Sequence, residues 1–307
     1  MVERKIPTAP CWIEPGILPK NGICVVGGEA KIGKTFNIIS GYGKALSCQE
    51  DLYGNPEWVV PEACRVLVIE QELGPYILQK RVKSIFENSN LKYYKDNLWV
   101  ISKEPSLKLD TAFDKIKYEV DLIQPNVLIL DPISNFHQGD ENSAREVEFL
   151  VNQIKTLLRQ YRELDLSIIF THHFGKPPNP QFADDIDRLS PYAFRGSSKW
   201  YDAVDTAHTI IKTQTNMRKD DEKQWLSWTM KNRFTLRATE PPKDFYTKFN
   251  TDNDQCVKFD RYEGEASKSA PPLKMKKVPT KIIDRQAQAA IVAEPGQANL
   301  RLEDFPE

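Results

Sequence analysis

The chain has 307 residues and carries 42 Lys and Arg against 43 Asp and Glu, so its formal net charge is −1. This balance excludes a uniformly basic nucleic-acid binder and limits any nucleic-acid contact to local patches. Hydrophobic residues make up 40% of the sequence and charged residues 28%, which is typical of a globular protein and excludes extensive disorder.

The five cysteines include no Cys-x-x-Cys pair, which argues against a disulfide framework or a cysteine-based zinc site and favours a reducing compartment. The N-terminus has no apolar signal segment, and no apolar run approaches the ~20 residues that span a bilayer. We therefore expect a cytoplasmic protein that makes no membrane contact.

In chain order, short runs rich in Val, Ile and Leu alternate with longer helix-compatible segments. This order predicts an α/β fold with a mainly parallel sheet and helices on both faces. The best marked helix is expected over 143–164, because Ser143 and Glu146 have capping-box spacing and apolar residues follow at i, i+3 and i+4. The predicted parallel strands are 22–28, 65–72, 98–102, 126–132 and 166–173.

After His173 the pattern changes. The segment 175–194 has three prolines early and no periodicity, so we expect a long loop there. Residues 1–262 are expected to form the folded core, and residues 263–307, which are poor in aromatics and rich in Ala, Pro, Lys and Gln, a flexible C-terminal tail. The strand-like runs that follow the loop predict an antiparallel extension of the sheet; they are 207–213, 224–232, 244–249 and 256–260.

Residues 28–35, GEAKIGKT, fit the phosphate-loop pattern G-x-x-x-x-G-K-[S/T] without a mismatch, between a predicted strand and a helix-compatible segment. Backbone N–H groups of such a loop surround phosphates, the Lys34 ammonium reaches the β- and γ-phosphates, and the Thr35 hydroxyl holds Mg²⁺. The alternative, a chance glycine-rich turn, is disfavoured by the flanking strand. We expect Lys34 to face solvent and not to support the core. The residues expected to bind ATP are Gly28, Glu29, Ala30, Lys31, Ile32, Gly33, Lys34, Thr35 and Phe36.

Carboxylates follow two of the predicted strands. Asp131 ends an apolar strand, where the Mg²⁺ partner of a nucleotide site belongs, although a turn or helix-cap aspartate is the alternative. Because Pro132 and not a glutamate comes next, the base that activates water must come from elsewhere. Glu70 and Glu72, at the end of an earlier strand, could accept a proton from water; otherwise they are solvated strand-end charges.

His172 and His173 end the strand predicted over 166–173. A histidine at this position could sense the γ-phosphate and pass the signal to the following loop. The alternative is a pair that is simply solvated or hydrogen-bonded. Two histidines without a third ligand are weak grounds for a metal site.

These motifs, in this order, resemble the RecA-type P-loop ATPases, and most of all the RepA/DnaB class of hexameric replicative helicases, over about residues 12–237. The opening WIEPGILPKNGICVVGGEAKIGKT is similar to the start of plasmid and phage RepA-like ATPases. The resemblance implies that Glu72 is the catalytic glutamate, with Glu70 in reserve, and that His173 is the phosphate-sensing residue.

Later segments extend the resemblance. WTMKNRF matches a Lys-Asn-Arg element whose Lys and Arg enter the neighbouring subunit's nucleotide site, which implies that Lys231 and Arg233 act in trans. We expect both cations to project from a sheet edge, and the alternative is an exposed pair that only aids solubility. The segments DPISNFHQGDENSAREV and RGSSKWYDAVDTAHTI also match and point to Glu141, Asn142, Arg195, Gly196, Ser197 and Asp205.

The DNA-contacting loops of the family are expected after Asp131 and after His173. In this chain the second loop carries Asp184, Asp185 and Asp187, so it is not a basic stripe. We also expect no counterpart of the additional N-terminal domain of bacterial DnaB. Three cations could still contact phosphates singly: Lys176, Arg188 and Arg195.

The sequence therefore predicts a RecA-like ATPase that uses ATP and Mg²⁺, forms a homo-oligomer expected to be a hexamer, and acts on single-stranded DNA as a helicase or translocase. The tail is a candidate contact for a replication partner. Two alternatives remain open. One is a RadA- or KaiC-like recombination or regulatory ATPase, and the other is a nucleotide-gated loader or adaptor without unwinding activity.

Overall fold

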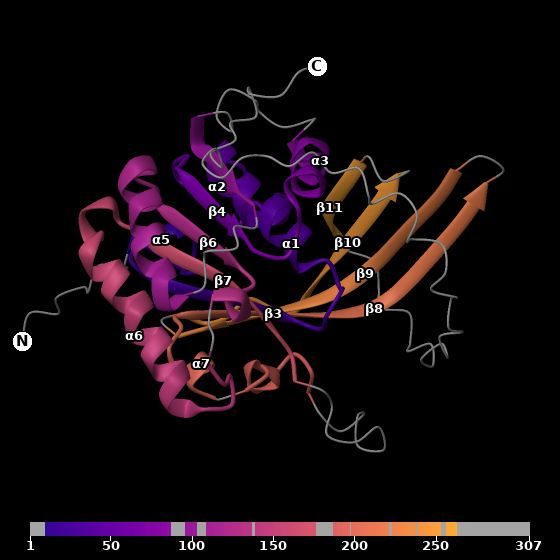
Figure 1. Cartoon of the computed structure of the whole chain (residues 1–307). Coiled ribbons are helices and arrows are strands. Elements are labelled where there is room, and N and C mark those ends of the chain that lie inside the picture. Colours follow the sequence, from indigo (N-terminus) through magenta and orange to yellow (C-terminus); the bar gives the residue numbers. More distant parts are fainter. Residues whose placement is uncertain are drawn as a thin grey trace, which may run out of the picture.

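The computed structural model describes residues 10–86, 96–102, 109–136, 139–175, 187–196, 198–220, 223–237, 239–252 and 256–262. One sheet runs through this part of the chain in the order β11-β10-β9-β8-β3-β7-β6-β4-β5, and β1 pairs with β2 in a small second sheet (Figure 1). The strands are β1 (Cys11–Ile13), β2 (Leu18–Pro19), β3 (Ile23–Gly28), β4 (Val66–Glu70), β5 (Leu98–Ile101), β6 (Val127–Asp131), β7 (Ser167–His173), β8 (Thr206–Asp220), β9 (Lys223–Leu236), β10 (Phe245–Asp252) and β11 (Cys256–Tyr262).

The centre of the sheet is parallel. Strands β5, β4, β6, β7, β3 and β8 pair side by side in parallel register, and β9, β10 and β11 continue the sheet in antiparallel register. Every residue of β3, β4 and β6 is buried, which explains why these strands are continuous apolar runs. The predicted α/β fold, with a mainly parallel sheet and antiparallel strands towards the C-terminus, is confirmed.

Helices cover both faces of the sheet (Figure 1). One hydrophobic cluster joins the sheet to the segment after the phosphate loop and to α3, and a second joins the opposite face to α5 and α6. The helix predicted over 143–164 is α6 followed by a 3₁₀ turn, and the Ser143 side chain accepts a hydrogen bond from the Glu146 amide. The helices are α1 (Lys34–Asn37), α2 (Lys44–Cys48), α3 (Pro75–Phe86), α5 (Leu109–Ile123), α6 (Ala144–Gln160) and α7 (Lys199–Asp202).

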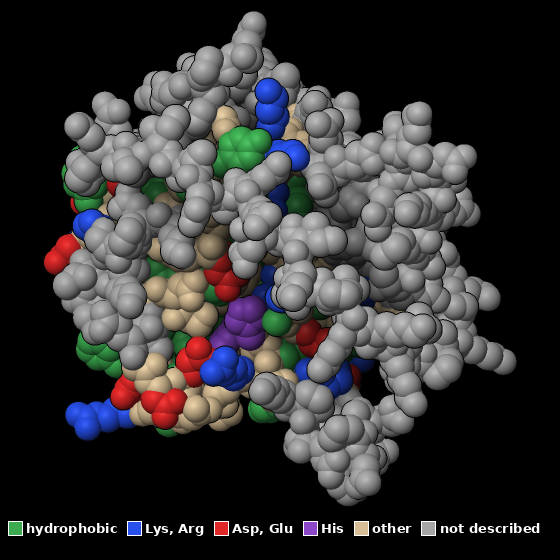
Figure 2. Space-filling view, turned by 45° about the vertical axis from the view of Figure 1, so that its right-hand side comes forward, with side chains coloured by type: hydrophobic (Ala, Val, Ile, Leu, Met, Phe, Trp, Pro, Cys, Tyr) green, Lys and Arg blue, Asp and Glu red, His purple; other side chains and the backbone are tan. Residues whose placement is uncertain are grey.

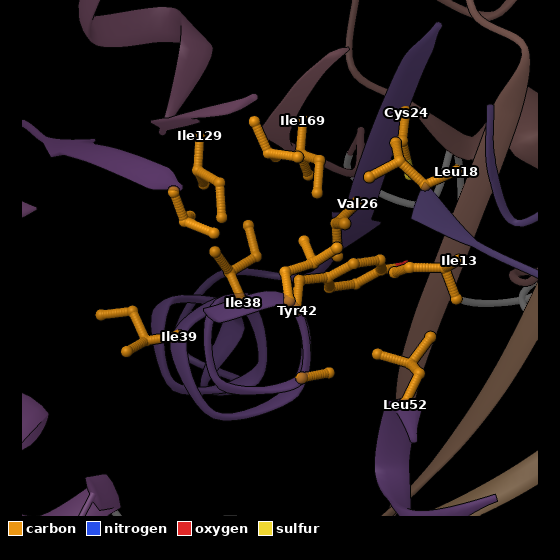
Figure 3. Close-up of a cluster of buried hydrophobic side chains, with 14 of the residues drawn as sticks. Ile13, Leu18, Cys24, Val26, Ile38, Ile39, Tyr42, Leu52, Ile129 and Ile169 are labelled. Atoms are coloured by element: carbon orange, nitrogen blue, oxygen red, sulfur yellow. The ribbon is translucent and has the colours of Figure 1, made fainter. Parts of the chain in front are cut away.

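The segment after the phosphate loop is one continuous helical stretch, in which a π-helix, Ile38–Gly43, joins α1 to α2. Ile38 and Tyr42 of the π-helix point towards Val26 of β3 and Ile129 of β6 (Figure 3). Full burial of an isoleucine side chain such as that of Ile38 stabilises the fold by about 1.5–3 kcal/mol. The helix that carries the phosphate loop is therefore fixed to the centre of the sheet.

A buried hydrogen-bond chain ties the same helix to the antiparallel strands. The Tyr42 hydroxyl lies 3.0 Å from His208 Nδ1, His208 Nε2 lies 3.0 Å from Asn232 Oδ1, and Asn232 Nδ2 donates to the Thr247 hydroxyl at 2.9 Å. All four side chains are buried. Because Asn232 is held inward on β9, the residues on either side of it lie on the opposite face of the sheet.

This hydrogen-bond chain predicts acid sensitivity. Burial lowers the pKa of His208 to about 3, whereas an unfolded histidine titrates near ~6.5. Between these values the unfolded state binds a proton that the folded state does not, so the free energy of unfolding falls as the pH falls, by up to about 1.4 kcal/mol per pH unit. The difference in free energy of unfolding between wild type and His208→Gln should therefore shrink by about 2 kcal/mol from about pH 7 to about pH 5. Urea denaturation measures this difference, and an unchanged value would contradict a neutral, buried His208.

The structure corrects one expectation about the antiparallel strands. Strands β10 and β11 pair beyond β9, so β9 is not a sheet edge, and the expectation that Lys231 and Arg233 project from an edge is wrong. Both cations lie on a face of the sheet instead. Strands β8 and β9 are longer than predicted and extend as a ribbon (Figure 1).

Several predicted features lie outside the described residues. They are the tail over 263–307 and the part of the long loop over 176–186, together with Lys176, Asp184, Asp185 and Ser197. Among the helices that the structure does describe, none is long and apolar enough to cross a membrane.

Candidate active site

The phosphate-loop sequence connects β3 to α1, as predicted. Gly33 immediately precedes α1 with a φ of 92°, a conformation that residues with a side chain rarely adopt, so the turn requires glycine here. Glu29, Ala30 and Lys31 are exposed, and Ile32 is buried and holds the loop against the core. The loop thus lies at the carboxyl end of the central strand, where α/β sheets bind ligands.

Lys34 does not face solvent, contrary to expectation, because only 7% of its surface is exposed. Its ammonium donates to the carbonyl oxygens of Gly28 at 3.1 Å and Glu29 at 2.8 Å, and it lies 3.1 Å from Nδ1 of His173. The loop curls around the side chain because a buried ammonium needs acceptors. Burial lowers the pKa of Lys34 to about 8, and the carboxylate of Asp131 opposes this shift.

Asp131 ends β6 and is buried. The Thr171 hydroxyl of β7 donates to Asp131 Oδ1, whereas Oδ2 is buried and accepts no hydrogen bond of ordinary geometry from the residues that the structure describes. The Thr35 hydroxyl is near enough to lower the pKa of Asp131, but burial dominates and raises it. A carboxylate oxygen with no donor of its own, next to a hydroxyl, suits Mg²⁺, which prefers oxygen ligands. Asp131 and Thr35 therefore fit the metal-binding role that the sequence predicts for them.

The two glutamates after β4 have different surroundings. Glu70 is fully buried, and its two oxygens accept hydrogen bonds from the amides of Glu72 at 3.0 Å and Leu73 at 2.7 Å. Burial raises the pKa of Glu70 to about 7, and its contacts show that it shapes the turn. The Glu72 side chain is 49% exposed, and its interaction with His173, 3.8 Å away, lowers its pKa. This geometry favours Glu72 over Glu70 as the acceptor of a proton from water.

The two histidines at the end of β7 point in different directions, as alternation along a strand requires. The His173 ring lies between the Lys34 ammonium and the Glu72 carboxylate. His172 is buried, stacks on Phe194 with ring centroids 5.9 Å apart, and has its pKa lowered to about 3 by burial. Of the pair, His173 is therefore the candidate phosphate sensor, and His172 is a core residue.

Arg81 of α3 is a residue of this site that the sequence analysis missed. Its guanidinium lies 4.4 Å from the ring centroid of Phe36, directly after the phosphate loop. Burial lowers the pKa of Arg81, and the charges of Glu70, Asp131 and Glu72 oppose that shift. A single arginine on an amphipathic helix carries no sequence signal, so only the packing of α3 reveals it.

Lys231 and Arg233 share one carboxylate, Asp244, which directly precedes β10. Arg233 donates to it through Nε at 2.7 Å and Nη2 at 2.9 Å, and Lys231 Nζ lies 2.9 Å from it. Asp187 pairs with Nη1 of Arg233. Through the pairing of β9 with β8 and of β8 with β3, Arg233 lies level with the end of β3. Within the described chain the ion pairs of these two cations are thus with Asp244 and Asp187, and not with the cluster around Lys34.

The loops after β6 and β7 pack against each other. Arg195 Nε lies 3.4 Å from Glu141 Oε2. Gly196 has a φ of 88°, and a Cβ atom there would lie 2.2 Å from the backbone oxygen of Glu141, so this position also requires glycine. Asp205 lies elsewhere, because its carboxylate accepts a hydrogen bond from the amide of Ile23 at the start of β3.

The sequence comparison agrees with this geometry. A family model described as an AAA domain matches residues 3–179, which include the phosphate loop, Asp131 and His173. The chain belongs to this family. It therefore has an ATPase domain of the kind that binds and hydrolyses nucleotide. The match ends before Lys231 and Arg233, and a search of curated proteins found no match to the chain.

The residues of this AAA domain suit transfer of a phosphoryl group to water. A bound Mg²⁺ would neutralise phosphate charge, and Thr35 and Asp131 are the residues that would hold it. The Lys34 ammonium can exchange its loop carbonyls for phosphate oxygens. The Glu72 carboxylate, which is ionised at neutral pH like an ordinary glutamate, can orient a water and take its proton. The His173 ring lies between the Lys34 ammonium and the Glu72 carboxylate and so links the two groups.

Proposed function

We propose that the chain is a ring-forming, ATP-driven helicase or translocase of the RepA type that uses Mg²⁺ and acts on single-stranded DNA. The observation that carries this proposal is that the nucleotide site is directly connected to the loops that follow β6 and β7. Strands β6 and β7 end in Asp131 and His173, and the loops that follow them pack together through Arg195 and Glu141. A change at the nucleotide can thus reach one shared loop surface, as a motor that moves a strand requires.

The placement of Lys231 and Arg233 supports an assembly, proposed to be a hexamer. Asp244 orients both cations at the level of the phosphate loop, and within the described chain their ion pairs are with Asp244 and Asp187 and not with residues of that loop. Cations placed in this way can stabilise charge on a nucleotide bound by a neighbouring subunit. The tail over 263–307 is a proposed contact for a replication partner.

The charge pattern of the described loops favours a second candidate, a nucleotide-gated loader or adaptor. Arg188 lies 3.2 Å from Glu29, and Arg195 lies 3.4 Å from Glu141, so both cations already have acidic partners. The face shown in Figure 2 likewise carries intermixed acidic and basic side chains and no basic stripe among its described residues. Strong binding to DNA in the absence of nucleotide is therefore not expected.

Native mass and ATP turnover distinguish the two candidates. With a non-hydrolysable ATP analogue we expect a mass of about six subunits, as in the hexameric ATPases. In such a ring each subunit supplies an arginine to the nucleotide site of its neighbour. A single-stranded oligonucleotide should raise turnover at low salt, with log affinity falling against log salt by about 0.7 per phosphate contacted. Slow turnover that DNA leaves unchanged would support the adaptor, and a monomer under all conditions would contradict the motor.

A further inference from the structure

Two carboxylates bind the Arg233 guanidinium, and they differ in kind. Asp244 accepts from both Nε and Nη2, also pairs with Lys231, and has a side chain that is 26% exposed. Asp187 contacts the guanidinium through Nη1, and its side chain is 56% exposed. Asp244 is thus a two-point, mostly buried partner, and Asp187 is a one-point, exposed partner.

The planar guanidinium can bind an oxyanion along either of two edges. Asp244 occupies the edge formed by Nε and Nη2, which leaves the edge formed by Nη1 and Nη2 for a second anion. Asp187 accepts from Nη1, which is one of the two nitrogens of that second edge. A phosphate that approaches Arg233 from outside would therefore have to displace the carboxylate of Asp187.

Asp187 is held at this edge by the chain around it. Its Oδ1 accepts a hydrogen bond from the Leu189 amide at 3.0 Å. The next residue, Arg188, donates to the carbonyl oxygen of Gly175 at 3.2 Å and lies 3.2 Å from the carboxylate of Glu29 in the phosphate loop. The segment that carries Asp187 is therefore fixed to the phosphate loop of the same subunit.

We propose that Asp187 is an intramolecular competitor of phosphate: it occupies the Nη1 edge of Arg233 in a single subunit and yields that edge to the nucleotide of a neighbouring subunit. Asp244 is a positioning residue that orients Arg233 before and after the exchange. This proposal rests on the proposed function, because it requires that Arg233 acts in trans. Assembly then competes with an internal ion pair, and the higher charge of a nucleotide's phosphates favours the exchange.

Neutral variants of the two aspartates are expected to act in opposite directions. Asp187→Asn keeps the acceptor for the Leu189 amide but weakens the hold on Arg233. The subunit concentration at half-assembly with a non-hydrolysable ATP analogue should therefore fall by about two- to fivefold per interface, as expected for an exposed ion pair.

Asp244→Asn loosens the orientation of Arg233, so turnover per assembled subunit should fall while ATP affinity stays unchanged. Sedimentation velocity over a concentration series and steady-state turnover measure these effects.

Asp202→Asn is the matched control, because it removes the same charge from an exposed position on α7 and should leave half-assembly unchanged. A damaged fold would give aggregate and not a discrete oligomer, and sedimentation velocity separates the two, so a gain in the discrete oligomer for Asp187→Asn is specific. If Asp187→Asn assembles no more readily than wild type, or loses turnover as Asp244→Asn does, the proposal is wrong and Asp187 only helps to orient Arg233. If wild type itself does not assemble with nucleotide, the proposed ring fails, and this proposal fails with it.

Discussion

Glu72→Gln is expected to lower ATP turnover by about 10²–10⁴-fold, the usual contribution of a positioned proton acceptor, and to leave ATP binding unchanged. The Glu72 side chain is half exposed beside His173, so an amide of the same shape removes the proton acceptor without opening the core. Phosphate release measures turnover, and calorimetry with the ATP analogue measures binding.

Glu70→Gln is the matched control. Both oxygens of Glu70 accept backbone amides, and a glutamine can supply only one acceptor oxygen in their place. This variant should therefore lower the unfolding temperature and reduce turnover much less than Glu72→Gln. A stably folded Glu70→Gln protein that has lost turnover, together with an active Glu72→Gln protein, would show that the base lies two residues earlier.

Arg233→Ala is expected to lower turnover by about 10³–10⁵-fold, the range typical of arginine fingers. The fold should persist, because Asp244 keeps its ion pair with Lys231 at 2.9 Å. Arg237→Ala is a suitable control: this arginine follows β9 directly, donates to the carbonyl oxygen of Asp202, and should be dispensable for turnover. A fully active Arg233→Ala protein would remove the proposed role in trans.

The parallel core could be predicted because its strands are buried on both faces. The runs over 22–28, 126–132 and 166–173 each contain a continuous apolar stretch, such as 127–130 and 168–170, so they are visible without any long-range contact. The outer half of β8 was missed, because residues 214–220 have no apolar run and are strand only by pairing with β9. Tertiary pairing, and not local propensity, determines the length of that ribbon.

The site divides in the same way. Thr35, Asp131 and His173 could be placed together because the carboxyl ends of parallel strands meet at one edge of a sheet. The burial of Lys34 could not be predicted, since it depends on the loop curling back towards His173, 139 residues away in sequence. The acidic partners of Arg233 likewise belong to no motif: Asp244 meets it through the register of β10 on β9, and Asp187 meets it from the chain between β7 and β8.

Completion of one subunit's site by Arg233 of its neighbour is tested most directly by mixing two inactive variants. Lys34→Ala lacks the phosphate-loop ammonium and Arg233→Ala lacks the finger, so each alone should be inactive. In mixed assemblies, verified by native mass, some interfaces pair an intact loop with an intact finger, and turnover should exceed the sum of the two separate proteins. Mixed assemblies whose turnover never exceeds that sum, at any mixing ratio, would contradict a site shared between subunits.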